Sequence, residues 1–147
     1  MIKEDKELLL KDLCARLPYG VKLHKTYEEC NPLELRSFDI DNDKLVLYKY
    51  KGEVLTICDA DSIERFGKIK YKPYLFPLSS MTEEQKQEYT YIVNYISPDD
   101  TDNWKEGEFI YVEQFAQLMH FYHINHLDYM GLIEKGLAID ATGLNVY

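Results

Sequence analysis

The chain has 147 residues, of which 46% are hydrophobic and 29% are charged, a balance typical of one folded domain with a hydrophobic core. Its 26 acidic and 17 basic residues give a formal charge of −9. This charge argues against a nucleic acid or an anionic membrane as the partner, and it favours a basic partner. We therefore expect a single domain over residues 1–147.

Cysteine usage and the N-terminal sequence indicate the cellular compartment. The three cysteines, Cys14, Cys30 and Cys58, form no CxxC motif, which argues against a disulfide framework or a zinc ribbon and favours a reducing compartment. The N-terminal MIKEDKELLL lacks the features of a signal peptide, and no apolar run approaches the length of a membrane span. We expect a cytoplasmic protein.

The first half of the chain predicts one helix followed by short strands. An apolar i, i+3, i+4, i+7 pattern predicts a helix over residues 6–17, and its members are Leu10, Leu13, Cys14 and Leu17. On this pattern Cys14 is a small buried residue. Pro18 stops the helix and Gly20 turns the chain. Strands are expected at residues 21–27, 33–40, 45–50 and 53–58, and within 63–71.

Residues 72–84, KPYLFPLSSMTEE, separate the strand-rich half from a helical half. Pro73 and Pro77 cannot donate ladder hydrogen bonds, so we expect an extended strap without regular structure. Thr82 and Gln85 lie at the ends of the sequence Thr-Glu-Glu-Gln, which is typical of a capping box at the start of a helix.

The second half predicts helices. Tyr89, Ile92 and Val93 mark one, and residues 112–123 form another, with an expected buried side that carries Val112, Phe115, Ala116 and Met119. Asp128 can cap a last short helix that ends at Gly136, and residues 137–147 are expected to be a poorly ordered tail. The predicted fold is α+β: an N-terminal helix, an antiparallel meander of four to five strands, and two to three C-terminal helices packed on the sheet.

Histidines form the one candidate metal site. His120 and His123 share a helix face at i, i+3, and His126 follows in the same HFYHINH sequence. Imidazole is a common ligand of zinc and other divalent transition metals, so His120 and His123, completed by His24 from elsewhere in the chain, are candidate ligands. We expect no cofactor here and interpret these residues as a helix end whose histidines cap its C-terminal carbonyls; the metal site is the alternative.

No catalytic motif such as GxSxG, a P-loop or GxGxxG is present, so nothing in the sequence supports an enzyme, although catalytic groups can assemble from distant residues. Thirteen tyrosines are the strongest compositional anomaly, and tyrosine is typical of contact surfaces. We predict a protein-interaction module that uses Tyr74, Phe76 and Trp104, because large apolar groups in loops often serve as recognition sites. The alternatives are that these three residues lock the strap onto the helices, or that the tyrosine-rich surface mediates self-association.

Three blocks of sequence carry a resemblance: LLLKDLCARLPYGVKL at 8–23, KPYLFPLSSMTEE at 72–84 and HLDYMGLIEKGLAI at 126–139. Together they resemble a group of small proteins of unknown function from gut anaerobic bacteria, often associated with prophages and other mobile elements. Similar sequences more often read KPYLRP where this chain has Phe76. The resemblance implies a bacterial or phage cytoplasmic origin and an accessory role. It implies no activity, cofactor or functional residue.

Overall fold

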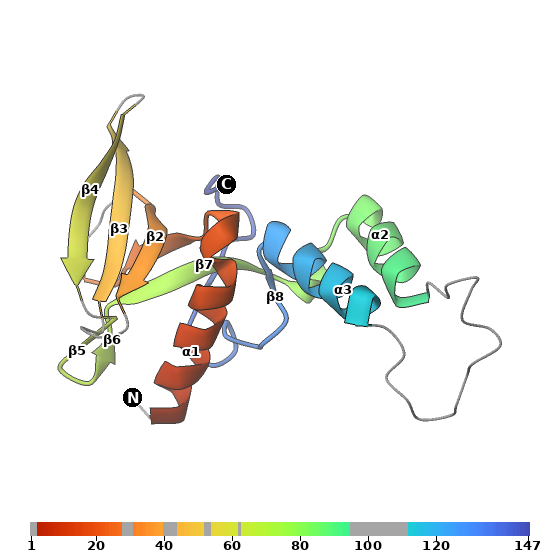
Figure 1. Ribbon diagram of the computed structural model, residues 1–147, viewed down its shortest axis with the longest axis horizontal. Coiled ribbons are helices and arrows are strands. Elements are labelled where there is room, and N and C mark those ends of the chain that lie inside the picture. Colours follow the sequence, from red (N-terminus) through yellow and green to blue (C-terminus); the bar gives the residue numbers. More distant parts are fainter. Residues whose placement is uncertain (1–2, 28–30, 40–43, 52–53, 62, 95–111) are drawn as a thin grey trace.

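The computed structural model describes residues 3–27, 31–39, 44–51, 54–61, 63–94 and 112–147. The fold is α+β, as predicted, with an N-terminal helix, a mixed sheet and C-terminal helices (Figure 1). The elements in chain order are α1 (Lys3–Arg16), η1 (Leu17–Tyr19), β1 (Lys22–Lys25), β2 (Leu33–Asp39), β3 (Lys44–Lys51), β4 (Val54–Asp61), β5 (Glu64–Arg65), β6 (Lys68–Ile69), β7 (Tyr71–Pro77), η2 (Leu78–Ser80), α2 (Glu83–Asn94), α3 (Val112–Ile124), β8 (Leu127–Asp128) and β9 (Ile139–Asp140).

Strands β1 to β4 form an antiparallel meander in which each strand pairs with the next. The predicted meander is confirmed for these four strands. The fifth strand expected within residues 63–71 is instead a separate hairpin of β5 and β6, followed by β7. Strand β7 pairs with β1 on one side, and the two-residue strands β8 and β9 add to it in parallel, which makes the sheet mixed.

The expectation of an irregular strap is wrong for residues 72–77, which belong to β7. The Thr26 N–H donates to the Lys70 carbonyl oxygen at 2.8 Å, so Thr26 and Lys70 are a hydrogen-bonded pair of the antiparallel β1–β7 ladder. Along such a ladder, hydrogen-bonded and non-hydrogen-bonded pairs alternate. Pro73 lies opposite Leu23, at a position that needs no N–H directed toward β1. Pro77 is the last residue of the strand. Both prolines therefore occupy positions that the ladder tolerates.

Helix α1 lies on the sheet and supplies Leu9 and Leu13 to the main core (Figure 1). The prediction that Cys14 is buried is wrong, because its side chain is exposed. The buried stripe is instead Leu9, Asp12, Leu13 and Arg16. The predicted end of the helix is confirmed: η1 follows α1 with Pro18 in its first turn, and Gly20 has a left-handed φ of 67°.

The capping box of α2 is confirmed. The Gln85 N–H donates to Thr82 Oγ1 at 3.2 Å, and the Thr82 N–H donates to Gln85 Oε1 at 2.9 Å. The C-terminal helices do not lie on the sheet as expected; α2 and α3 pack on each other beyond the end of β7 (Figure 1).

Helix α3 has the predicted span, but two of the side chains expected to be buried are exposed, while Met119 is half-buried and the side chain of Val112 is not described. Phe115 is 57% exposed and Ala116 is exposed, whereas Phe121 is buried. The reason is that α3 meets α2 and β8 through Phe121, which packs with Ile92 and Leu127.

The segment after β8 is packed, so the expectation of a poorly ordered tail is wrong. The Asp128 carboxylate accepts the N–H groups of Leu132 at 2.9 Å and Ile133 at 2.8 Å, which confirms the predicted cap, although residues 129–136 form turns rather than a helix. Farther on, the Ala141 N–H donates to the Leu75 carbonyl oxygen at 2.8 Å, and Val146 is buried.

Candidate functional site

A pocket of about 500 Å³ lies between α2 and α3. Its lining is mostly apolar and consists of Glu88, Tyr91, Ile92, Ala116, Gln117, His120 and Phe121. The two helices meet through the buried Ile92 and Phe121, while Tyr91 and Ala116 are exposed. The pocket is therefore an open cleft between two packed helices, with a size in the usual range of binding sites.

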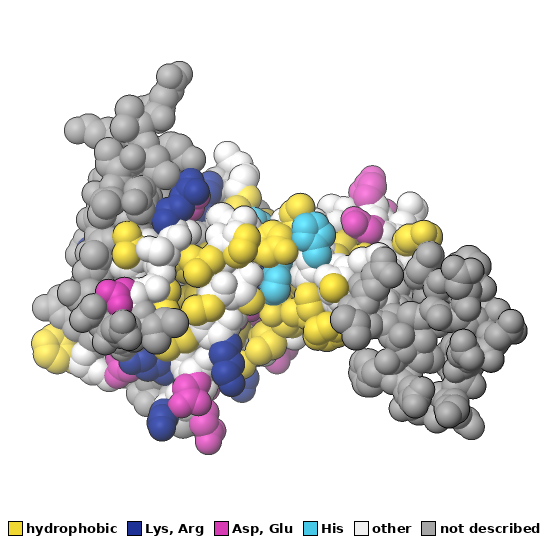
Figure 2. Space-filling view, viewed as in Figure 1, with side chains coloured by type: hydrophobic (Ala, Val, Ile, Leu, Met, Phe, Trp, Pro, Cys, Tyr) yellow, Lys and Arg dark blue, Asp and Glu magenta, His cyan; other side chains and the backbone are white. Residues whose placement is uncertain are grey.

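Large apolar side chains stand exposed on the same two helices. Tyr91 is 65% exposed, and Phe115 and Val93 are also exposed. Figure 2 shows hydrophobic side chains across the middle of the molecule beside histidines, and acidic side chains over the α2 region. Exposed apolar groups that gather beside a pocket are typical of a contact surface.

The exposed side of α2 is acidic. It carries Glu83, Glu84 and Glu88 against a single lysine, Lys86, which is 2.6 Å from Glu83 Oε1. Hydrogen bonds from its own backbone N–H and from Thr82 hold the pKa of Glu84 below its ordinary value, so this carboxylate stays charged. Of these glutamates Glu88 lines the pocket, so a ligand bound there lies beside negative charge.

His120 connects the pocket to α1. Its Nδ1 atom lies 3.1 Å from the Tyr19 hydroxyl oxygen, and Tyr19 belongs to the turn that follows α1. The Tyr19 ring also lies 5.3 Å from the ring of His123 and 5.6 Å from that of His120. One tyrosine thus contacts both histidines, and a hydrogen bond fixes the imidazole that lines the pocket.

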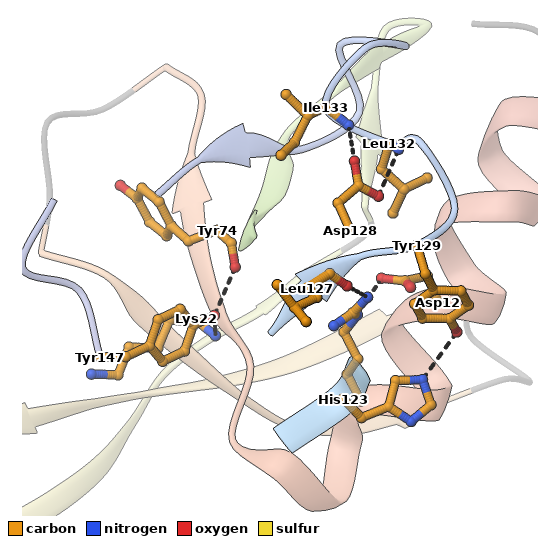
Figure 3. Close-up of polar contacts among 11 residues, drawn as sticks. Asp12, Lys22, Tyr74, His123, Leu127, Asp128, Tyr129, Leu132, Ile133 and Tyr147 are labelled. Atoms are coloured by element: carbon orange, nitrogen blue, oxygen red, sulfur yellow. Dashed lines mark hydrogen bonds and ion pairs between the residues drawn. The ribbon is translucent and has the colours of Figure 1, made fainter. Parts of the chain in front are cut away.

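His123 also belongs to a polar network that joins α1, α3 and the segment at β8 (Figure 3). The Arg16 Nε–H donates to Asp12 Oδ2 at 2.7 Å, and Arg16 Nη2 donates to the Leu127 carbonyl oxygen at 2.8 Å. The guanidinium carbon lies 5.4 Å from the centre of the Tyr129 ring, and the Tyr129 hydroxyl is 3.0 Å from His123 Nε2. These contacts tie α1 to α3 and β8. Asp12 and Arg16 are fully buried, so they support the site without reaching a ligand.

Burial affects the protonation of two members of this network, His123 and Tyr129. It lowers the pKa of His123, and the nearby Arg16 guanidinium lowers it further. Burial also raises the pKa of the Tyr129 hydroxyl. Both groups are therefore neutral at pH 7 and hydrogen-bond to each other without charge.

A second set of contacts holds the last residues of the chain against the sheet. The Tyr147 hydroxyl accepts the Lys22 N–H at 3.2 Å and donates to the Tyr74 carbonyl oxygen at 2.8 Å (Figure 3). The Tyr147 ring stacks on His126 with centroids 3.7 Å apart. Burial, with Arg16 and Lys22 nearby, lowers the pKa of His126 to about 4, so this imidazole is neutral at pH 7.

The predicted contact residues have internal partners. Tyr74 is buried, and its hydroxyl lies 3.1 Å from His24 Nδ1. Phe76 is half-buried, with its ring 6.1 Å from that of Tyr147. Trp104 lies outside the described residues. The role of these three residues in partner binding stays a prediction.

The candidate metal ligands fall in different places. His24 lies against Tyr74 and His123 against Tyr129, and only His120 and His123 share a neighbour, Tyr19. Within the ranges that the structure describes, no group of three or more His, Cys, Asp or Glu side chains is placed to hold a metal ion. Zinc sites use three or four protein ligands. Metal binding through His120 and His123 would need ligands that these ranges do not place.

Sequence reasoning missed the pocket and the buried ion pair. A signal for the ion pair was present, since Asp12 and Arg16 stand at i, i+4 on the helix face that Leu9 and Leu13 define. The pocket had no comparable signal, because it depends on how α2 and α3 pack against each other.

No family model, curated protein or solved structure matches the chain. Within the part of the chain that the structure describes, no helix has both the length and the apolar character needed to cross a bilayer. The pocket and its surroundings are therefore the basis on which a function can be assigned.

Proposed function

We propose that the protein is a non-enzymatic interaction module that binds a basic segment of a partner protein in the pocket between α2 and α3. An apolar side chain of the partner enters the pocket, and neighbouring lysine or arginine side chains face the glutamates of α2. The observation that carries this proposal is the apolar pocket of about 500 Å³ beside the acidic face of α2. Opposite charge on the partner speeds encounter and selects among competing segments.

The chemistry of the pocket suits binding of this kind. Its two buried residues, Ile92 and Phe121, offer an apolar floor, and the exposed ring of Tyr91 can cover a bound side chain. An aromatic side chain that buries about 200 Å² would contribute on the order of 5 kcal/mol. The cost of association offsets much of this gain, so we expect weak, reversible binding in the micromolar to millimolar range.

The resemblance to small proteins of bacterial mobile elements supports an accessory role for such a module. A small acidic protein with an open pocket can bind a host or phage protein reversibly without catalysing a reaction. The negative charge of the chain, −9, favours a basic partner over the acidic proteins that it would repel.

Selection from a displayed library of random peptides tests the proposal. We expect selected peptides to carry an aromatic or aliphatic residue beside lysine or arginine, and to lose binding when Ala116→Arg places a long cationic side chain in the pocket. The matched control is Cys14→Arg, which adds the same charge at an exposed position of α1, outside the pocket lining and away from the glutamates of α2.

Both substituted positions are exposed on helices, so both variants should fold, which circular dichroism would verify. The proposal is wrong if selection enriches no peptide, or if the enriched peptides bind Ala116→Arg as well as they bind Cys14→Arg.

A further inference from the structure

The β5–β6 hairpin presents an aromatic ring at its tip. Phe66 is 90% exposed and has a φ of 53°, and Gly67 follows with a φ of 72°. Two successive left-handed residues are typical of a two-residue type I′ turn, which favours asparagine or glycine. A bulky residue there is a strained exception, and such exceptions gather at functional sites.

The two residues that flank this turn in the sequence are basic, although the chain as a whole is acidic. Lys68 follows the turn with an exposed side chain, and Arg65 precedes Phe66 in the sequence. The tip thus combines one exposed aromatic ring with positive charge. This is the chemistry that the pocket between α2 and α3 is suited to bind, with its apolar floor and Glu88 in its lining.

The tip and the pocket belong to opposite ends of the molecule. In Figure 1 the β5–β6 hairpin lies at the lower left, below the meander, whereas α2 and α3 lie on the right, with α1 between them. The tip of one molecule is therefore placed to contact the pocket of another rather than its own.

We propose that Phe66 of one molecule enters the α2–α3 pocket of a second copy of this chain, with Lys68 beside the glutamates of α2. This inference rests on the proposed function, because it assigns a partner to the same pocket. The tip and the pocket are different surfaces, so two arrangements can form. Two copies that exchange tips around a two-fold axis make a closed, isologous dimer, whereas one-way contacts are heterologous and continue as an open chain.

Sedimentation velocity of the full chain over increasing concentration tests the proposal. We expect the average mass of the wild type to rise above that of the monomer, and Phe66→Asn and Ala116→Arg each to weaken association at least about tenfold. Phe66→Asn suits the left-handed turn, so the hairpin should be retained. Cys14→Arg is the matched control, because Cys14 belongs neither to the tip nor to the pocket, and it should associate like the wild type.

Mixing the two defective variants makes the test specific. Phe66→Asn keeps an intact pocket and Ala116→Arg keeps an intact tip, so an equimolar mixture should form a heterodimer that neither variant forms alone. The inference is overturned if the wild type stays monomeric up to about millimolar concentration, if Phe66→Asn associates like the wild type, or if the mixture stays monomeric. If the wild type is monomeric but selected peptides bind its pocket, this inference is overturned and the proposed function stands.

Discussion

Replacing Asp12 by asparagine should destabilise the fold far more than a change of surface charge. Asp12 and Arg16 are both fully buried, and Arg16 Nε lies 2.7 Å from Asp12 Oδ2. Asparagine keeps the shape of the side chain but leaves the guanidinium buried without its counter-charge. Breaking a buried pair from one side costs about 3–5 kcal/mol, and a typical domain is stable by about 5–15 kcal/mol. Asp12→Asn should therefore remove a large part of the free energy of unfolding.

A double-mutant cycle in urea, followed by circular dichroism, measures this coupling. In Asp12→Asn/Arg16→Met neither charge remains buried and unpaired, so the loss should be smaller than the sum of the two single losses. We expect it to be on the order of 1–3 kcal/mol, because the Leu127 carbonyl oxygen loses its donor Arg16. The control is Glu83→Gln, which breaks the ion pair between Glu83, 79% exposed, and Lys86, 51% exposed. Because this pair is on the surface, its loss should lower the free energy of unfolding by less than about 1 kcal/mol. Additive losses, or an Asp12→Asn loss as small as that of the control, would refute the reasoning.

Three further predictions concern the histidine stack, the hairpin tip and the capping box. Burial lowers the pKa of His126 from 6.5 to about 4, so the folded state resists protonation and its stability, complete above pH 6.5, falls as the pH drops toward 4. After allowance for solvent screening, urea denaturation should show that the free energy of unfolding falls by about 2 kcal/mol between pH 6.5 and pH 4. The fall should be smaller in His126→Asn, and an equal fall in both proteins would contradict this prediction. Phe66→Asn should raise the free energy of unfolding by about 1 kcal/mol, because asparagine adopts the left-handed conformation more easily, and a fall in the melting temperature would argue against a strained turn. Thr82→Ala should lower the stability by about 1 kcal/mol and speed amide hydrogen exchange in the first turn of α2, whereas unchanged exchange would mean that the capping box contributes little.

Helix α1 shows what periodicity can decide from sequence. The existence of the helix, its end at Pro18 and the left-handed Gly20 follow from local rules and were predicted. The face of the helix that is buried was not predicted correctly. Two sets of residues fit the i, i+3, i+4, i+7 pattern, namely Leu10, Leu13, Cys14, Leu17 and Leu9, Asp12, Leu13, Arg16. A count of apolar residues selects the first set, but the structure buries the second, because Asp12 and Arg16 form an ion pair and Arg16 Nη2 donates to a backbone carbonyl oxygen.

The mixed sheet and the pocket could not be predicted from the sequence, for a different reason. Strands β8 and β9 have two residues each, which is too short to show a period, and their partner β7 contains two prolines that argue against a strand. The pocket depends on α3 turning Phe121 inward and Phe115 outward, which follows from its contacts with α2 and β8. Local signals such as the capping box and the Asp128 cap were sufficient where neighbours in sequence make the contact.

The most direct test of the pocket as a binding surface is an NMR titration of the ¹⁵N-labelled full chain with the capped peptide Arg-Phe-Gly-Lys. If the pocket binds a basic, aromatic segment, the amide signals of Tyr91, Ile92 and Ala116 should shift together and saturate. The acidic peptide Glu-Phe-Gly-Glu should produce much smaller shifts, and Ala116→Arg should abolish the response that Cys14→Arg retains. Shifts scattered over the surface, equal responses to both peptides, or an unchanged response in Ala116→Arg would contradict the assignment of this pocket as the binding site.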